Sequence, residues 1–221
     1  VTATDEHRGD QPHAKELEAQ RRVHAAEAAP HHLIDRHEVV GPRGAEQGYR
    51  YAPGINAGEL VDVLGGGICQ VASSLFGAAF FSGLEVVSAR PHSRPSSYVD
   101  MGLDSTVVWP SVDLKLRNPY DFPVVLHMTV NQGQVQAEVL GPRRPYQVMF
   151  ERELVETQDF ARVERADAEL RTGTSRVSQR GMRGFTLSRK RKLMQAGEVV
   201  KEEDWTLRYP PTREIVYVGT N

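Results

Sequence analysis

The sequence predicts an α+β fold with one buried helix packed on a mainly antiparallel sheet, plus a smaller β-rich C-terminal module. Two observations predict it. A single strong helical pattern at residues 70–82 is followed by short alternating segments typical of strands. A run of glycine, proline and arginine at residues 141–145 then separates these segments from a second β-like stretch. A chain of 221 residues with 39% hydrophobic content can bury one good core and a small second module.

The helical segment is residues 70–82 (QVASSLFGAAFFS). Val71, Leu75 and Ala79 recur at the i, i+4 spacing of a helix, and apolar neighbours widen this stripe. Gly83 supplies the left-handed residue that commonly ends a helix. We therefore expect a helix that is buried on most sides.

The segments that follow the helix are short and strand-like. Residues 124–130 and 134–139 predict a hairpin, because Asn131-Gln132-Gly133 between them is a typical turn. Alternation and glycine turns continue beyond residue 145, so residues 146–221 are expected to be β-rich. The strands expected in the body are residues 84–87, 105–109, 113–117, 124–130 and 134–139.

Residues 1–32 are polar and are expected to lie outside the folded body. Residues 14–29 are rich in helix formers but carry almost no apolar stripe, which predicts a solvated helix or a partly disordered arm. The chain starts at Val1 without a charged-then-apolar leader, so either a leader has been removed or the chain has been trimmed. The predicted division is an arm at 1–32, a body at 33–142 and a tail at 146–221.

Composition excludes several classes of function. The net charge of −2 gives no global sign of nucleic-acid binding, and the basic run at residues 176–192 is expected to be a solvated β-face rather than a site for an anionic polymer. The most apolar stretch, residues 71–87, is too short and too interrupted to span a membrane. The histidines before residue 38 lack the ligand spacing of a metal site, so no metal or cofactor is predicted.

The only cysteine, Cys69, follows three glycines at the expected start of the helix. A helix N-terminus can lower the pKa of a thiol through its unpaired N–H groups and its positive end. The same N–H groups suit an oxyanion hole, for which the backbone of Gly66, Gly67 and Gln70 is the predicted set. The alternative is a tight strand-to-helix turn with a small buried cysteine, because a lone cysteine is often inert.

A catalytic thiol needs a base, and His92 is the candidate. It lies in a proline-bracketed loop, whereas His127 is expected on a strand face. Cys69, His92 and Asp104 follow the Cys, His, acid order of papain-like and transglutaminase-like enzymes. The alternatives are a backbone hydrogen bond for His92 and a turn cap for Asp104. The predicted substrate contacts are Arg90, Ser93, Arg94 and Tyr98, with the arginines suited to a carboxylate.

The body of the chain contains a series of short motifs in a fixed order. They are residues 38–43 (EVVGPR), 48–49 (GY), 58–61 (GELV), 65–71 (GGGICQV), 83–87 (GLEVV), 90–99 (RPHSRPSSYV), 102–107 (GLDSTV) and 113–119 (DLKLRNP). Through these motifs, residues 38–142 resemble the VanW family, named for an accessory gene of vancomycin-resistance clusters.

The tail contains two further motifs, at residues 179–185 (QRGMRGF) and 214–220 (EIVYVGT). Through them, residues 146–221 more weakly resemble the G-five domain of bacterial envelope proteins.

The resemblance implies a bacterial, exported protein of the cell envelope whose partners are peptidoglycan stem peptides and glycan strands. Some VanW proteins act as L,D-transpeptidases, which implies a cysteine acyl-enzyme formed on Cys69 with His92 as the base. The G-five resemblance implies that the tail targets the chain to wall polysaccharide. The rival hypothesis is a non-catalytic, glycan-binding envelope protein in which the buried cysteine is structural.

One segment departs from the family pattern. VanW proteins usually read PGE-x-F-S/D-F-N before the VVGPR run, whereas residues 29–37 here are APHHLIDRH. The family's phenylalanines are missing from this segment. We therefore expect a lost or rebuilt strand at this wall of the cleft.

Overall fold

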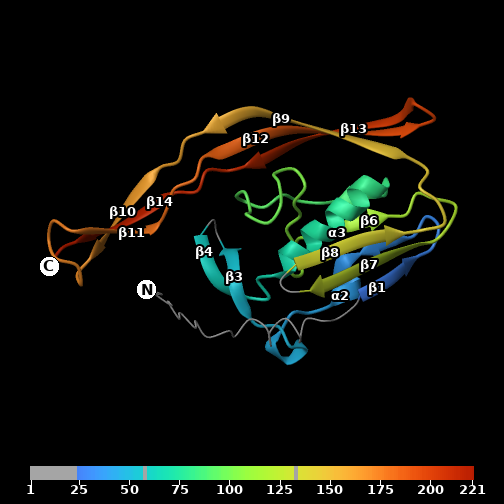
Figure 1. Ribbon diagram of the computed structural model, residues 1–221. Helices are drawn as coiled ribbons and strands as arrows, with labels where there is room; N and C mark the ends of the chain where they lie inside the picture. Colours follow the sequence, from blue (N-terminus) through green and yellow to red (C-terminus); the bar gives the residue numbers. More distant parts are fainter. Residues whose placement is uncertain (1–23, 57–58, 132–133) are drawn as a thin grey trace, which may run out of the picture.

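The computed structural model describes residues 24–56, 59–131 and 134–221, and β-structure dominates them (Figure 1). The prediction of one helix on a single mainly antiparallel sheet is wrong, because the described residues form fourteen strands divided among five small sheets. Prolines and glycines interrupt the body so often that most of its strands are too short to join one continuous sheet. No helix in these ranges is long and apolar enough to cross a membrane.

The helix predicted from the apolar spacing is present as α3 (Ile68–Ser82), and it begins two residues earlier than predicted. Gly83 ends it in the left-handed region at φ 81°. The helix packs against one face of a small antiparallel sheet, through β8 (Gln134–Leu140). Its fully buried side chains, which form the centre of the core, are Ala72, Phe76, Ala79 and Phe80.

The strands of the body surround α3. The predicted hairpin is confirmed as β7 (Val124–Asn131) paired with β8. A second sheet has the order β2 (Leu33–Asp35), β6 (Lys115–Arg117), β5 (Glu85–Ser88), and a separate hairpin joins β3 (Tyr51–Asn56) to β4 (Glu59–Leu64). Two short helical segments, α2 (Arg36–Val40) and η1 (Ala45–Gln47), lie between β2 and β3.

Three local predictions for the body need correction. Residues 24–28 are neither helical nor disordered but form β1 (His24–Ala28), which pairs with β7. Residues 1–23 of the predicted arm lie outside the described residues. In the divergent segment 29–37, where a lost or rebuilt strand was expected, the strand is not lost: residues 33–35 form β2 and pair with β6. The strand predicted at 105–109 is reduced to isolated bridges, since the chain turns back at Pro110, which lacks an N–H.

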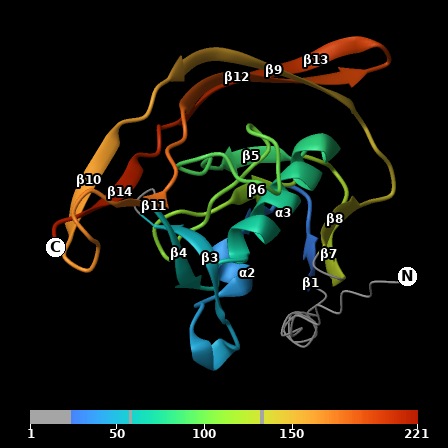
Figure 2. The same cartoon turned by 60° about the vertical axis from the view of Figure 1, so that its left-hand side comes forward.

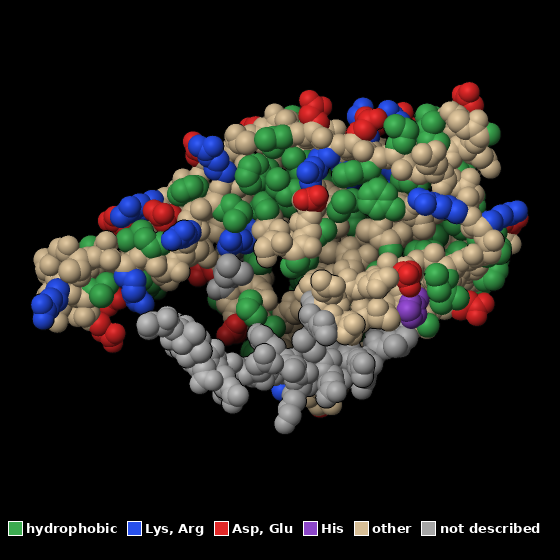
Figure 3. Space-filling model, viewed as in Figure 1, with side chains coloured by type: hydrophobic (Ala, Val, Ile, Leu, Met, Phe, Trp, Pro, Cys, Tyr) green, Lys and Arg blue, Asp and Glu red, His purple; other side chains and the backbone are tan. Residues whose placement is uncertain are grey.

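The tail is β-rich, as predicted. Its long sheet arches over α3, and its second sheet lies at the far end, near the C-terminus (Figures 1 and 2). The outer face of the arch carries exposed charged and hydrophobic side chains (Figure 3). The long sheet has the order β13 (Glu198–Tyr209), β12 (Gly184–Gln195), β9 (Gln147–Gln158), and the other β10 (Arg162–Asp167), β14 (Glu214–Gly219), β11 (Ser175–Gln179).

The basic run at 176–192 is not simply a solvated β-face. Alternation along β12 turns Arg189 and Arg191 inward, where their side chains are 4% and 0% exposed. Arg191 donates to the carbonyls of Phe80 and Leu84 at the end of α3. These arginines therefore attach the long sheet to the helix that carries Cys69.

Candidate functional site

The three glycines before Cys69 form the turn that starts α3. Gly65 has φ 75°, a left-handed conformation that suits glycine. A Cβ on Gly66 would lie 2.4 Å from the carbonyl oxygen of Ala52 in β3, so only glycine fits there. The β3–β4 hairpin and the turn thus pack backbone against backbone. This contact fixes where the helix starts and where Cys69 lies.

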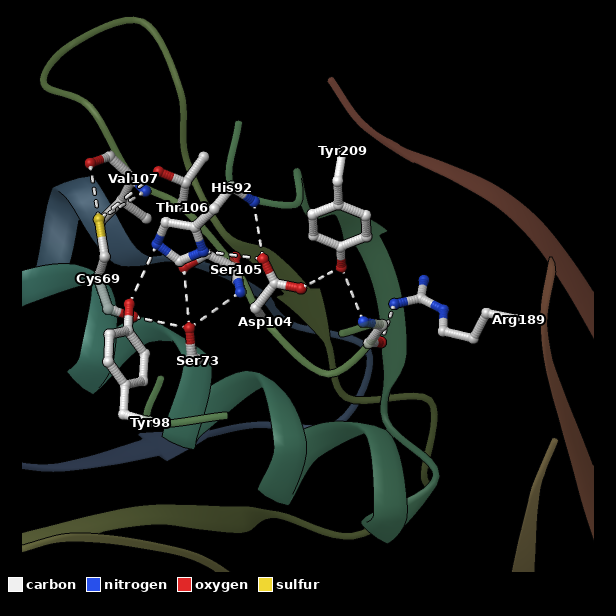
Figure 4. A network of polar contacts seen from close by, with 11 residues as sticks. Cys69, Ser73, His92, Tyr98, Asp104, Ser105, Thr106, Val107, Arg189 and Tyr209 are labelled. Carbon is white, nitrogen blue, oxygen red and sulfur yellow. Dashed lines mark hydrogen bonds and ion pairs between the residues drawn. The ribbon is translucent and has the colours of Figure 1, made fainter. Parts of the chain in front are cut away.

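The thiol of Cys69 is partly buried and faces the segment that follows Asp104 (Figure 4). The N–H of Val107 donates to Sγ at 3.5 Å, and the hydroxyl of Thr106 lies 3.6 Å from the same atom. Donors at this distance stabilise a thiolate more than a neutral thiol.

His92 and Asp104 are paired beside this thiol. Nδ1 of His92 lies 2.8 Å from Oδ2 of Asp104, and the backbone N–H of His92 donates to the same oxygen at 2.7 Å. Their residues are 5% and 3% exposed, so the pair is almost completely shielded from water. Figure 4 shows His92 between Cys69 and Asp104, the order that a nucleophile, a base and an orienting acid require.

The electrostatics of the pair favour an ionised thiol. Burial raises the pKa of Cys69, but the neighbouring side chain of His92 and the hydrogen bonds with Val107 and Thr106 outweigh it, and the pKa falls from 9.0 to about 7. Burial lowers the pKa of His92, whereas the hydrogen bond with Asp104 and the neighbouring thiol of Cys69 raise it, with a net rise from 6.5 to about 9. Between about pH 7 and 9 these pKa values favour the thiolate form of Cys69 next to the charged form of His92.

Asp104 remains ionised although it is buried. Burial raises the pKa of its carboxyl, and hydrogen bonds from His92 and from Tyr209 lower it below its ordinary value. Tyr209 lies at the end of β13 and donates to Oδ1 of Asp104. The sequence analysis missed Tyr209, because nothing local to it indicates a partner 105 residues away.

The backbone donors at the helix start differ from the predicted set. The N–H of Gly66 donates to Val63 and that of Gln70 donates to Gly67, so neither is available to a ligand. Within the described residues, no acceptor meets the N–H of Gly67 or of Cys69. Of the backbone donors proposed for an oxyanion hole, those of Gly66 and Gln70 are thus occupied, and those of Gly67 and Cys69 are free within the described residues.

The four residues predicted to contact the substrate differ in how closely they approach His92. The hydroxyl of Tyr98 lies 3.1 Å from Nε2 of His92, and burial raises the pKa of Tyr98 to about 12. Arg90 and Ser93 are exposed, and within the described residues neither side chain is hydrogen-bonded to Cys69, His92 or Asp104. Arg94 is partly buried, and its Nη1 has no hydrogen-bond partner there. Of the four residues, only Tyr98 touches the His92 side chain.

Two other arginines, Arg36 and Arg43, influence the thiol electrostatically, and the sequence analysis missed both. Arg36 is 3% exposed, and none of its guanidinium nitrogens has a partner in the described part of the chain. Burial lowers the pKa of Arg36 to about 10, as does the charge of Arg43, while the charge of Cys69 acts in the opposite direction. Arg43 donates to Nδ1 of His37 at 2.8 Å. The two positive charges favour the ionised form of Cys69.

The groups around Cys69 are of the kinds that thiol chemistry uses. Within residues 24–56, 59–131 and 134–221, no group of three or more His, Cys, Asp or Glu side chains is arranged to hold a metal ion. A low-pKa thiol, a charged imidazole and free backbone N–H groups are the components that thiol acyl transfer requires.

Comparison with known proteins identifies two domains. Residues 17–140 match the family described as VanW like protein, and residues 151–221 match the G5 domain. The uncharacterized protein YoaR of Bacillus subtilis is 41% identical over 97 residues, which are 44% of this chain and 32% of YoaR. The vancomycin B-type resistance protein VanW of Enterococcus faecalis is 26% identical over 146 residues, 59% of this chain and 53% of that protein.

The chain thus spans about a third and about half of the lengths of these two relatives. Among solved structures, a G5 domain of an IgA1 protease is 26% identical, with a TM-score of 0.24. That match covers 37% of this chain and 99% of the solved domain.

Proposed function

We propose that this chain, which belongs to the VanW-like protein family, is a cell-envelope cysteine acyltransferase of the L,D-transpeptidase type that acts on peptidoglycan stem peptides. The combination of a VanW-like domain with a G5 domain supports the envelope and peptidoglycan part of the proposal. The name of the enterococcal relative, a vancomycin resistance protein, agrees with a role at the cell wall. The reaction itself is inferred from the site.

One observation carries the proposal: a cysteine with a pKa of about 7 lies beside a buried His92–Asp104 pair. A purely structural cysteine has no need of a charged imidazole, and burial alone would raise its pKa. Here the hydrogen bonds reverse the effect of burial. Perturbed pKa values of this kind concentrate at catalytic sites.

In the first half of the reaction, the thiolate of Cys69 attacks the carbonyl carbon between the third and fourth residues of a stem peptide. The N–H groups of Gly67 and Cys69 stabilise the negative charge that develops on the carbonyl oxygen. The C–N bond then breaks, His92 gives its proton to the leaving amine, and D-alanine departs. The products are a thioester on Cys69 and a neutral His92.

In the second half, the side-chain amine of another stem peptide attacks the thioester. His92 accepts a proton from this amine as the C–N bond forms, and the Cys69 thiolate leaves. The site returns to the thiolate–imidazolium state, and the net reaction exchanges one amine for another. Tyr98, beside Nε2 of His92, is proposed to contact the substrate at this position. Ser93, Arg90 and Arg94 remain proposed contacts further along the substrate.

A second candidate function is glycan binding without catalysis, and the G5 domain favours it. In this case Cys69 serves only to pack the start of α3. The two functions predict different reactivity of Cys69. A structural cysteine resists alkylation until the protein unfolds, whereas a catalytic cysteine is alkylated in the folded protein.

Intact-mass measurement of the protein after incubation with a tetrapeptide muropeptide tests the enzymatic proposal. We expect a covalent adduct equal to the muropeptide minus D-alanine, because the acyl group remains on Cys69 until an amine resolves it. The Cys69→Ser variant serves as the control and should gain no thioester. A folded wild-type protein that yields neither this adduct nor any cross-linked product would contradict the proposal.

A further inference from the structure

The long sheet of the C-terminal domain holds the loop that carries Asp104. Arg152 in β9 donates to the carbonyl of Met101 at 2.7 Å, and Arg189 in β12 donates to the carbonyl of Gly102 at 2.9 Å. These contacts join neighbouring strands of one domain to consecutive residues of the other. The loop is therefore supported by the tail and not only by its own domain.

Gly102 lets the loop lie flat against that sheet. Its φ of 92° is a conformation that favours glycine. A Cβ there would meet Arg152, Arg189 and Leu207 at ordinary contact distances of 3.6–3.8 Å. The backbone thus approaches side chains of three strands at once, two residues before Asp104.

Tyr209 is the residue of the C-terminal domain that contacts the carboxylate of Asp104. It is 1% exposed, its hydroxyl accepts the N–H of Gly102 at 2.7 Å, and it donates to Oδ1 of Asp104 (Figure 4). A tyrosine hydroxyl has one proton. Because Gly102 is the donor in its own contact, that proton is available for Asp104.

The carboxylate of Asp104 is consequently held at both oxygens. Tyr209 holds Oδ1, so Oδ2 is directed to the ring and the backbone N–H of His92. A donor to a carboxylate lowers the pKa of that group. Ionised Asp104 in turn keeps His92 protonated, and protonated His92 keeps Cys69 ionised.

We propose that Tyr209 is a positioning residue of the Cys69 site, so that the C-terminal G5 domain takes part in acyl transfer in addition to any polymer it binds. The role of Tyr209 in acyl transfer rests on the proposed function. Its effect on the Cys69 thiol can be measured whether or not that function is correct. Residues of both domains would then form a single site. The body alone would lack the donor that fixes Asp104.

The test is the pH profile of Cys69 alkylation by iodoacetamide in the full chain carrying Tyr209→Phe. Removal of the hydroxyl raises the pKa of Asp104, makes His92 less basic and so raises the pKa of Cys69. We expect the midpoint of the profile to rise by roughly half a unit to one unit, with alkylation about two- to tenfold slower at pH 6–7. Rates well above pH 9 should match those of the wild type.

Tyr120→Phe is the matched control. Tyr120 is also a buried tyrosine, but its hydroxyl donates to the carbonyl of Ser82 at the far end of α3. This variant loses a comparable hydrogen bond and should leave the alkylation profile unchanged. Asp104→Asn should shift the profile in the same direction as Tyr209→Phe, and further.

An unchanged profile in folded Tyr209→Phe would overturn the inference, as would an equal shift in Tyr120→Phe. The two proposals fail separately, because alkylation requires no muropeptide. Absence of an acyl adduct in the wild type would contradict acyl transfer, while a shifted profile would still establish Tyr209 as a positioning residue for the thiol.

Discussion

Replacement of His92 by glutamine is expected to slow alkylation of Cys69 at pH 7 by about 50-fold. The pKa of Cys69 is about 7 because the neighbouring side chain of His92, together with hydrogen bonds from Val107 and Thr106, overcomes the effect of burial. Without the imidazolium the pKa should return to 9.0 or above, and the thiolate fraction at pH 7 would fall from about one half to about one in a hundred. The measurement is the iodoacetamide rate between pH 6 and 10.

His127→Gln is the control for this experiment. His127 lies on β7 and pairs with Glu138 at 3.1 Å, so the same substitution there removes a histidine–carboxylate contact without touching the thiol. Its rate should equal that of the wild type. If His92→Gln were alkylated as fast as the wild type at pH 7, the thiol would owe its reactivity to another group and the assignment of His92 would be wrong.

Replacement of Arg191 by methionine is expected to lower the free energy of unfolding by about 3 kcal/mol or more. The Arg191 side chain is completely buried, pairs with Glu203, and donates to the carbonyls of Phe80 and Leu84. Methionine restores much of the volume but none of the donors. Two buried carbonyls and one carboxylate would then lose a partner, which costs more than the hydrogen bonds contribute when formed.

Urea denaturation measures this change, with Lys192→Met as the neighbouring control. Lys192 pairs with Glu151 on the outer side of the sheet, where the carboxylate is 49% exposed. Exposed pairs of this kind contribute about 0–1 kcal/mol. If the free energy of unfolding fell equally in the two variants, the contacts of Arg191 with α3 would not stabilise the attachment of the sheet to that helix.

Local patterns in the sequence predicted the local structure well. The apolar spacing predicted α3, and alternation across a turn predicted the hairpin of β7 and β8, because both signals arise within about fifteen residues. The arrangement of sheets was wrong because strand pairing joins distant segments. The pairing of β1 with β7, for example, joins residues about a hundred positions apart, and neither strand specifies its partner.

The residues of the candidate site also divide into those that the sequence predicted and those that only the fold reveals. Cys69 was predicted from the glycines beside it, and His92 and Asp104 from their order along the chain; the structure brings the three together. Tyr209 was missed, because only the fold of the second domain over the first brings it to Asp104. Arg36 was missed because a charged side chain in a polar segment gives no sign that it will be buried.

We expect Cys69 to be ionised at neutral pH because the His92–Asp104 pair lies beside its thiol. The most direct test is a titration of the ultraviolet thiolate absorbance of the wild-type protein, with the Cys69→Ser protein as the blank. We expect a single inflection near pH 7, with the thiolate present through the range in which His92 is still charged. An inflection at pH 9 or above in folded protein would contradict it.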